Sequence, residues 1–214
     1  MIALDLDGVV ALLTPVVLRR LAEQVGLDLD QVRYWDPAHY DDLLAELPEP
    51  YRTEEVERMV SELYWDPETY RQAMPIPGAL EAAQWLARRK LLTAYITRRK
   101  SHTEAVTKAW LQERGFPLRP VHHVERPATK ADVAERIGAR VLVDDSPREA
   151  LEFAEAGLVP ILLAHRYNRH VDDPRVMRAE GWPALLGLLK ALPLDYRERR
   201  DPLGYGNKRG RRNG

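Results

Sequence analysis

Polar residues that could act together in one reaction occur at four places along this chain. Asp5 and Asp7 lie in and just after the first apolar run, and Thr97 ends another. Lys130 opens a helix-like segment, and the pair Asp144-Asp145 follows a third apolar run. Short apolar runs that stop at polar residues or glycine are typical of buried strands. If the strands are parallel, their carboxyl ends bring these groups to one edge of a sheet, where α/β proteins bind ligands.

The charges of these residues limit the chemistry they could perform. Alternation along a strand puts Asp5 and Asp7 on the same side. With Asp144 and Asp145 nearby, the carboxylates would repel one another and favour protonation unless cations are supplied. Mg²⁺ suits a carboxylate-rich site, and Lys130 would be a second cation. This set predicts phosphoryl transfer, in which one carboxylate becomes an aspartyl-phosphate and a second acid protonates the leaving group and then activates water.

The elements that must position these residues alternate between strand and helix. We expect strands from Ile2 and over 91–96, 121–124, 141–143 and 158–164, with helices over 77–90, 101–115 and 130–137 and from Ser146. Ser101-x-x-Glu104 and Ser146-x-x-Glu149 are expected to be capping boxes. The alternation predicts an α/β fold, with a Rossmann-like parallel sheet flanked by helices on both faces.

Residues 11–76 break this alternation, because they show helical patterning and no convincing strand. We therefore expect a helical domain inserted after the first strand, with residues 1–10 and 77–192 forming the core. From Asp28 to Tyr70 the chain has thirteen acidic and three basic residues, whereas from Asp195 to Gly214 it has seven basic and three acidic. Residues 193–214 have no periodicity and are expected to form a basic, mobile tail.

Composition excludes several classes of protein. The chain has 214 residues, a net charge of −1 and no cysteine, so disulfide scaffolds, thiol nucleophiles and thiolate metal sites are excluded. No apolar run approaches the roughly 18 residues that cross a bilayer. The first run has no basic residues before it and is broken by Asp5 and Asp7, which is not typical of a signal peptide. We expect a cytoplasmic protein that does not bind membranes.

The ordered set Asp5-x-Asp7-Gly8-Val9, Thr97, Lys130 and Asp144-Asp145 resembles the four motifs of the haloacid dehalogenase (HAD) superfamily of phosphatases. The resemblance covers residues 1 to about 165. It implies that Asp5 is the nucleophile and Asp7 the general acid and base, and that Thr97 and Lys130 bind phosphate. It further implies that Mg²⁺ is held by Asp5, the backbone carbonyl of Asp7 and Asp145, with Asp144 close by or acting through water.

Within the superfamily the chain looks most like the 5′(3′)-deoxyribonucleotidases. The resemblance rests on the first motif and on later segments: Pro75-Ile-Pro77-Gly78-Ala79, Ile96-Thr97-Arg98, Val143-Asp144-Asp145-Ser146-Pro147 and Tyr167-Asn168. It implies that the helical insertion is a cap of the C1 type. The second motif departs from the Thr-Ser-Pro of the best-known members, because Thr97 is followed by Arg98 and Arg99. Arg98 is therefore a candidate hydrogen-bond donor to the substrate phosphate, in place of a donor from the missing Thr-Ser-Pro sequence.

The insertion also suggests the substrate. It carries seven of the sixteen aromatic residues of the chain within forty residues. A nucleobase stacked on such a ring gains about 1–3 kcal/mol. Most of these rings are expected to build the core of the insertion, and Trp35 and Trp65 are the first candidates for contacting substrate.

The sequence thus predicts a Mg²⁺-dependent phosphatase acting on a small phosphorylated metabolite, with a ribo- or deoxyribonucleoside 5′-monophosphate as first choice. A sugar-phosphate phosphatase and a polynucleotide 3′-phosphatase of the same superfamily remain alternatives. Nucleic acid is the less favoured substrate, because an insertion with a net charge of −10 over residues 28–70 would repel a polyanion. A non-catalytic module that binds metal or phosphate is the alternative from another class, although it would not need the second acid at Asp7.

Overall fold

The computed structural model describes residues 1–32 and 40–191. Six parallel strands of these residues form one sheet in the order β5-β4-β1-β6-β7-β8. Their bounds are β1 Ile2–Leu4, β4 Leu92–Thr97, β5 Val121–His123, β6 Val141–Asp144, β7 Val159–Leu163 and β8 Met177–Ala179. This confirms the predicted α/β fold with a parallel sheet, and the strand order places β1 at the centre.

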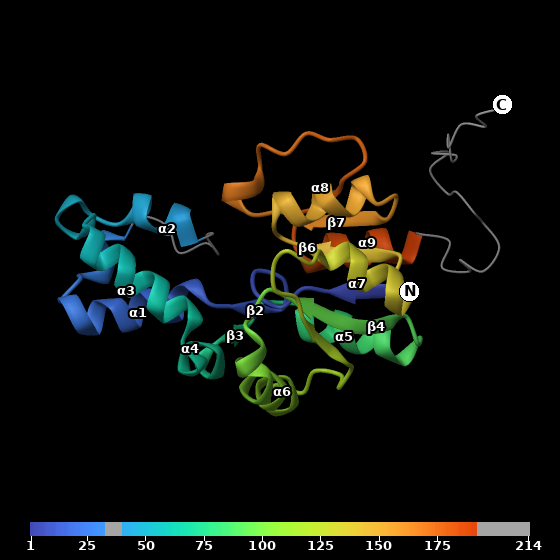
Figure 1. Ribbon diagram of the computed structural model, residues 1–214, viewed down its shortest axis with the longest axis horizontal. Coiled ribbons are helices and arrows are strands. Elements are labelled where there is room, and N and C mark those ends of the chain that lie inside the picture. The colour runs from blue at the N-terminus through green and yellow to red at the C-terminus, as the bar shows by residue number, and fades with distance from the viewer. Residues whose placement is uncertain (33–39, 192–214) are drawn as a thin grey trace.

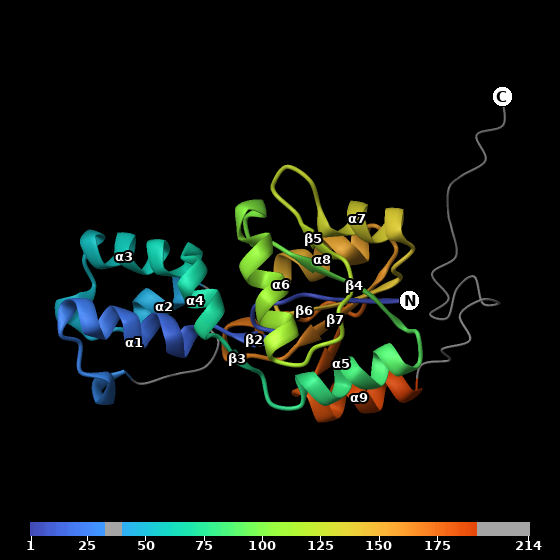
Figure 2. The same cartoon turned by 90° about the horizontal axis from the view of Figure 1, so that it is seen from below.

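Helices cover both faces of the sheet (Figure 2). The helices α7 Lys130–Ile137 and α8 Pro147–Glu155 lie on one face, and α5 Ala79–Arg88 and α9 Trp182–Ala191 lie on the other. The strands alternate accordingly, since Ile2 and Leu4 belong to one buried cluster and Ala3 to the other. The helix α6 Glu104–Glu113 contributes Trp110 to the larger cluster, on the same side as α5 and α9. Burial on both faces explains why the strands read as short apolar runs.

Three local features of the core differ from what the sequence predicted. Strand β8 was not predicted, because the three residues Met177-Arg-Ala179 are too few to show a strand pattern, and it forms by adding to the edge at β7. Ser101 is not the N-cap of α6: residues 101–103 form a 3₁₀ turn, and the Ser101 hydroxyl donates to Glu125 at 2.9 Å. Ser146 does cap α8 by accepting from the amide of Glu149, but the Glu149 side chain binds arginines instead of completing a capping box.

Residues between β1 and α5 form a helical insertion that lies to one side of the sheet (Figure 1). Its helices are α1 Thr14–Val25, α2 Tyr40–Glu46, α3 Glu54–Trp65 and α4 Pro67–Gln72. The first three enclose a separate apolar cluster that includes Leu18, Leu43 and Val60. Asp66 caps α4 by accepting a hydrogen bond from the amide of Glu68 at 2.9 Å.

The insertion is joined to the core by a feature that helical patterning did not predict. Strands β2 Ala11–Leu12 and β3 Met74–Pro75 pair antiparallel, so the two chain crossings run side by side. Each has two residues, which is too short for a pattern to be visible in sequence. Just before β3, Tyr70 of α4 is buried in the main cluster of the core and not in that of the insertion. Helix α4 therefore belongs as much to the core as to the insertion.

Among the described residues, no helix combines the length and the apolar character that a membrane span requires.

Candidate active site

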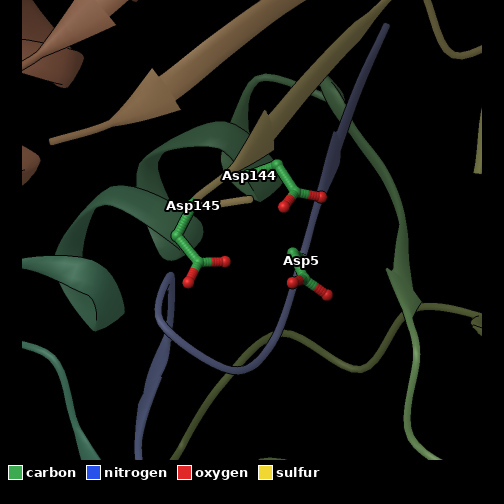
Figure 3. A group of neighbouring side chains, drawn as sticks. All are labelled: Asp5, Asp144 and Asp145. Carbon is green, nitrogen blue, oxygen red and sulfur yellow. The ribbon is translucent and has the colours of Figure 1, made fainter. Parts of the chain in front are cut away.

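Three carboxylates converge at the carboxyl edge of the sheet (Figure 3). Asp5 follows β1, Asp144 ends β6, and Asp145 is the next residue. Since β1 and β6 are parallel neighbours with Leu4 opposite Val143, their ends coincide. Each acid offers a carboxylate oxygen, and these oxygens all lie within 4.8 Å of one another. The predicted cluster of acids from distant parts of the sequence is therefore present in the fold.

The turn after β1 makes room for this convergence. Gly8 has a φ of 73°, a conformation that favours glycine. A Cβ at Gly8 would lie 2.1 Å from Oδ2 of Asp145, which no side chain could occupy without displacing that carboxylate. The glycine in Asp5-x-Asp7-Gly8 is thus required both for the turn and for the close approach of Asp145.

Lys130 is held at the cluster by the start of α7. Thr129 caps the helix by accepting from the amide of Asp132 at 3.0 Å, and the Asp132 carboxylate accepts from the amide of Thr129 at 3.1 Å. This reciprocal cap fixes the first residue of the helix, whose side chain is buried. The ammonium of Lys130 lies 2.9 Å from Oδ1 of Asp5 and donates to Oδ2 of Asp144 at 2.8 Å.

Burial gives the cluster an unusual electrostatic balance. It raises the pKa of Asp5 and of Asp144, with Lys130 acting in the opposite direction on both. Burial, and then the neighbouring Asp144, raise the pKa of Asp145 to about 7. For Lys130, burial alone would lower the pKa, but Asp144 and Asp5 raise it above its ordinary value. One lysine therefore does not fully neutralise the three converging acids.

These residues fit a hard divalent cation. Their donors are all carboxylate oxygens, and their mutual repulsion would be relieved by a second positive charge. Two donors differ in availability. Asp144 uses Oδ2 for Lys130 and Oδ1 for the amide of Ser146 at 2.9 Å. Asp145 is held by the hydroxyl of Tyr167 at Oδ2, so its other oxygen is the freer one.

Thr97 and Asp7 complete the predicted set. Thr97 is buried at the end of β4, which neighbours β1 with Leu4 opposite Tyr95, so it lies at the same edge as Asp5. Its hydroxyl oxygen accepts from the amide of Arg99 at 3.2 Å, which leaves its proton free to be donated. Asp7 lies in the turn after β1, and 31% of its side chain is exposed.

Arg98 does not have the position expected of a residue that donates hydrogen bonds to a bound phosphate. Its Nε and Nη2 donate to the two carboxylate oxygens of Glu149 at 2.9 and 3.0 Å. Its Nη1 donates to the carbonyls of Val124 and Ala128. All three nitrogens are thus engaged, by α8 and by the segment between β5 and α7. The arginine that reaches the acids is the next one, Arg99, which pairs with Asp7.

The segment after β7 is hydrogen-bonded both to the turn after β1 and to Asp145 after β6. His165 donates from Nε2 to the carbonyl of Gly8 at 2.7 Å, and Tyr167 donates to Asp145. The side-chain amide of Asn168 donates to the carbonyls of Asp145 and Leu163, each at 2.8 Å. The residue type of His165 gives no signal of this role in the sequence, whereas Tyr167-Asn168 was visible as part of the family resemblance.

Of the two tryptophans expected to contact substrate, Trp65 is the one that the described residues include. Trp35 lies outside the described residues. Trp65 ends α3 with 43% of its surface exposed, and the ammonium of Lys100 lies 5.4 Å from its ring centre. Tyr51 and Tyr64, by contrast, pack against the apolar cluster of the insertion. Trp65 is therefore an available ring at the side of the insertion nearest the loop after β4.

The fold is that of the HAD type. Solved structures with this fold include one described as a proposed β-phosphoglucomutase from Thermotoga maritima, with a TM-score of 0.57 and 18% identity over 89% of this chain and 98% of that one. A haloacid dehalogenase-like hydrolase from Streptococcus pneumoniae gives a TM-score of 0.55 and 13% identity over 88% and 97% of the two chains. At these identities the likeness shows the fold alone.

Sequence comparison identifies the family. The model of the family described as 5′ nucleotidase, deoxy (pyrimidine), cytosolic type C matches residues 1–192, and this chain belongs to that family. A proposed nucleotidase of Halalkalibacterium halodurans is 30% identical over 53% of this chain and 57% of its own length. A proposed 5′(3′)-deoxyribonucleotidase of Chlorobaculum tepidum is 24% identical over 80% of this chain and 75% of its own. The first of these alignments thus spans little more than half of the relative.

Proposed function

We propose that this chain is a Mg²⁺-dependent phosphatase that hydrolyses a small phosphomonoester, with a nucleoside 5′-monophosphate as its substrate, through an aspartyl-phosphate on Asp5. One observation carries the proposal. Asp5, Lys130, Asp144 and Asp145, which are far apart in the sequence, meet at one edge of the sheet. The family to which the chain belongs is named for the same reaction on nucleotides.

In this proposal Asp5 attacks phosphorus and displaces the alcohol of the substrate. Lys130 contacts both Asp5 and Asp144, and its charge would balance the negative charge that develops on the phosphoryl oxygens. The Thr97 hydroxyl, whose oxygen already accepts from an amide, is oriented to donate to one of those oxygens. Mg²⁺ held by Asp5, Asp145 and the Asp7 carbonyl would add positive charge at the same oxygens.

Asp7 would act twice in the cycle. It first gives a proton to the departing alkoxide, and it then takes a proton from the water that hydrolyses the aspartyl-phosphate. Its partial exposure, in contrast to the burial of Asp5, supports this assignment, because a leaving group and water must both reach it.

The helical insertion supports a nucleotide as the substrate. Trp65 presents an exposed ring beside Lys100, which follows the phosphate-binding loop at Thr97. A base stacked on this ring would lie beyond a phosphate bound at the sheet edge. The acidic insertion disfavours a polynucleotide, and salt would weaken polynucleotide binding steeply, because each phosphate contact releases counterions.

A substrate panel tests the proposal. Nucleoside 5′- and 3′-monophosphates, sugar phosphates and a 3′-phosphorylated oligonucleotide would be compared by phosphate release with Mg²⁺ and with chelator. Asp5→Asn protein serves as the control for contaminating phosphatases. We expect the highest kcat/KM for a nucleoside 5′-monophosphate.

The other outcomes distinguish the alternatives. Preference for a sugar phosphate or for the oligonucleotide would contradict the nucleotide but keep the phosphatase. Release of phosphate in excess chelator would contradict the role of Mg²⁺. Binding of Mg²⁺ and inorganic phosphate without any turnover would leave only a binding module.

A further inference from the structure

The guanidinium of Arg99 binds the carboxylate of Asp7 through two of its three nitrogens. Its Nε donates to Oδ1 and Oδ2 of Asp7 at 3.1 and 2.9 Å, and its Nη2 donates to Oδ1 at 2.5 Å. The Arg99 side chain has no exposed surface, whereas the Asp7 side chain is 31% exposed. The arginine thus approaches from inside the protein and leaves the outer side of the carboxylate open.

One face of the Arg99 guanidinium and its third nitrogen also have partners. Its central carbon lies 4.1 Å from the centre of the Tyr70 ring, a distance typical of a cation–π contact. Its Nη1 donates to the Thr107 hydroxyl at 3.2 Å. Tyr70 comes from α4 at the end of the helical insertion, and Thr107 comes from α6 of the core. Arg99 is therefore fixed on three sides by groups from three different elements.

We propose that Arg99 is a positioning residue that holds Asp7 ready for proton transfer to the leaving group, and that Tyr70 couples this position to the helical insertion. The inference rests on the role proposed for Asp7 as acid and base. A carboxylate on a turn has rotational freedom that a paired Arg restricts, because the planar guanidinium binds in few orientations. Any movement of α4 relative to the sheet would displace Tyr70 and thus the arginine that orients Asp7.

The choice of substrate separates positioning from a purely structural role. An alkyl phosphate, such as the best nucleotide or sugar phosphate of the panel, needs a proton on its leaving oxygen. In contrast, p-nitrophenyl phosphate releases a phenolate that is stable without one. General acid catalysis contributes about 10²–10⁴-fold. We expect Arg99→Met to lower kcat/KM for the alkyl phosphate at least about tenfold, and to change kcat/KM for p-nitrophenyl phosphate by less than about threefold.

Three variants refine this test. Arg99→Lys keeps a charge but cannot form the paired contact, so it should show the same selective loss if Arg99→Met folds poorly. Tyr70→Leu removes the ring that lies against the guanidinium and should reproduce part of the selective loss. In protein that already carries Asp7→Asn, Arg99→Met should have no further effect, because the two residues act as a unit.

Arg20→Met is the matched control. Arg20 binds the same helix through Asp66 at 2.5 Å and the Thr69 hydroxyl at 2.7 Å, but no contact joins it to Asp7 in the described structure. It should lower the melting temperature without any selectivity between the two substrates.

Equal losses on both substrates for the Arg99 variants, or additive losses with Asp7→Asn, would overturn this inference and leave the proposed function standing. Absence of any turnover by the wild-type chain would overturn the proposed function and this inference with it.

Discussion

Asp5 directly follows the central strand β1 and, like Asp144, contacts Lys130. Replacement by asparagine preserves shape and most hydrogen bonds but removes the nucleophilic oxygen anion. We expect Asp5→Asn to abolish turnover, with less than about one per cent of activity left, since covalent catalysis cannot proceed without it. Circular dichroism and melting curves would verify that the fold is kept. Substantial activity in clean protein would remove Asp5 as the nucleophile.

Asp144 and Asp145 are adjacent in sequence but differ in their contacts. Both oxygens of Asp144 are engaged by Lys130 and Ser146. We therefore expect Asp145→Asn to lower the affinity for Mg²⁺ by about 10–100-fold, and Asp144→Asn to lower it less. Asp144→Asn should instead destabilise the protein, because it removes a charge from a buried pair. Calorimetric titration with Mg²⁺ and denaturant unfolding would measure the two effects. The reverse order of affinities would assign direct ligation to Asp144.

At the scale of elements, Trp65 tests whether the insertion recognises a base. The exposed ring contributes little to the apolar cluster of the insertion, so Trp65→Ala should leave the melting temperature nearly unchanged. If the ring stacks a base, kcat/KM for nucleotides should fall by the equivalent of about 1–3 kcal/mol, and p-nitrophenyl phosphate should be affected much less. Tyr64→Ala, at the preceding position, is a control in which both substrates and stability should suffer together. The same pattern for Trp65→Ala would contradict base stacking.

At the scale of the whole molecule, the proposed metal site would link Mg²⁺ binding to stability. Mg²⁺ would bind the folded chain, where the carboxylates converge, and not the unfolded one. At a hundred times its dissociation constant, the ion should add about 2.7 kcal/mol to the free energy of unfolding. That corresponds to a rise of about 5–10 °C in melting temperature for a chain of this length. Calorimetric scans with and without Mg²⁺ would measure it, and Asp145→Asn should reduce the shift. An unchanged melting temperature for the wild-type chain would count against the site.

The sequence by itself determined the alternation of strands and helices, the place of the insertion, and the order of Asp5, Thr97, Lys130 and Asp144-Asp145. These features are local: apolar runs bury strands, and polar residues at their ends mark the edge where ligands bind. That β1 is central, and that β1 and β6 are neighbours, depends on the packing of the whole sheet.

The tertiary structure decided which neighbouring arginine meets the acids. Arg98 and Arg99 are alike in sequence and both follow Thr97, the last residue of β4, so strand alternation does not assign their directions. In the folded chain Arg98 meets Glu149 of α8, and Arg99 meets Asp7 and the ring of Tyr70. The edge strand β8, the β2–β3 pair and the hydrogen bond from His165 to Gly8 likewise join segments far apart in the chain. Their residues carry no local pattern, because the partners that stabilise them are brought near only by folding.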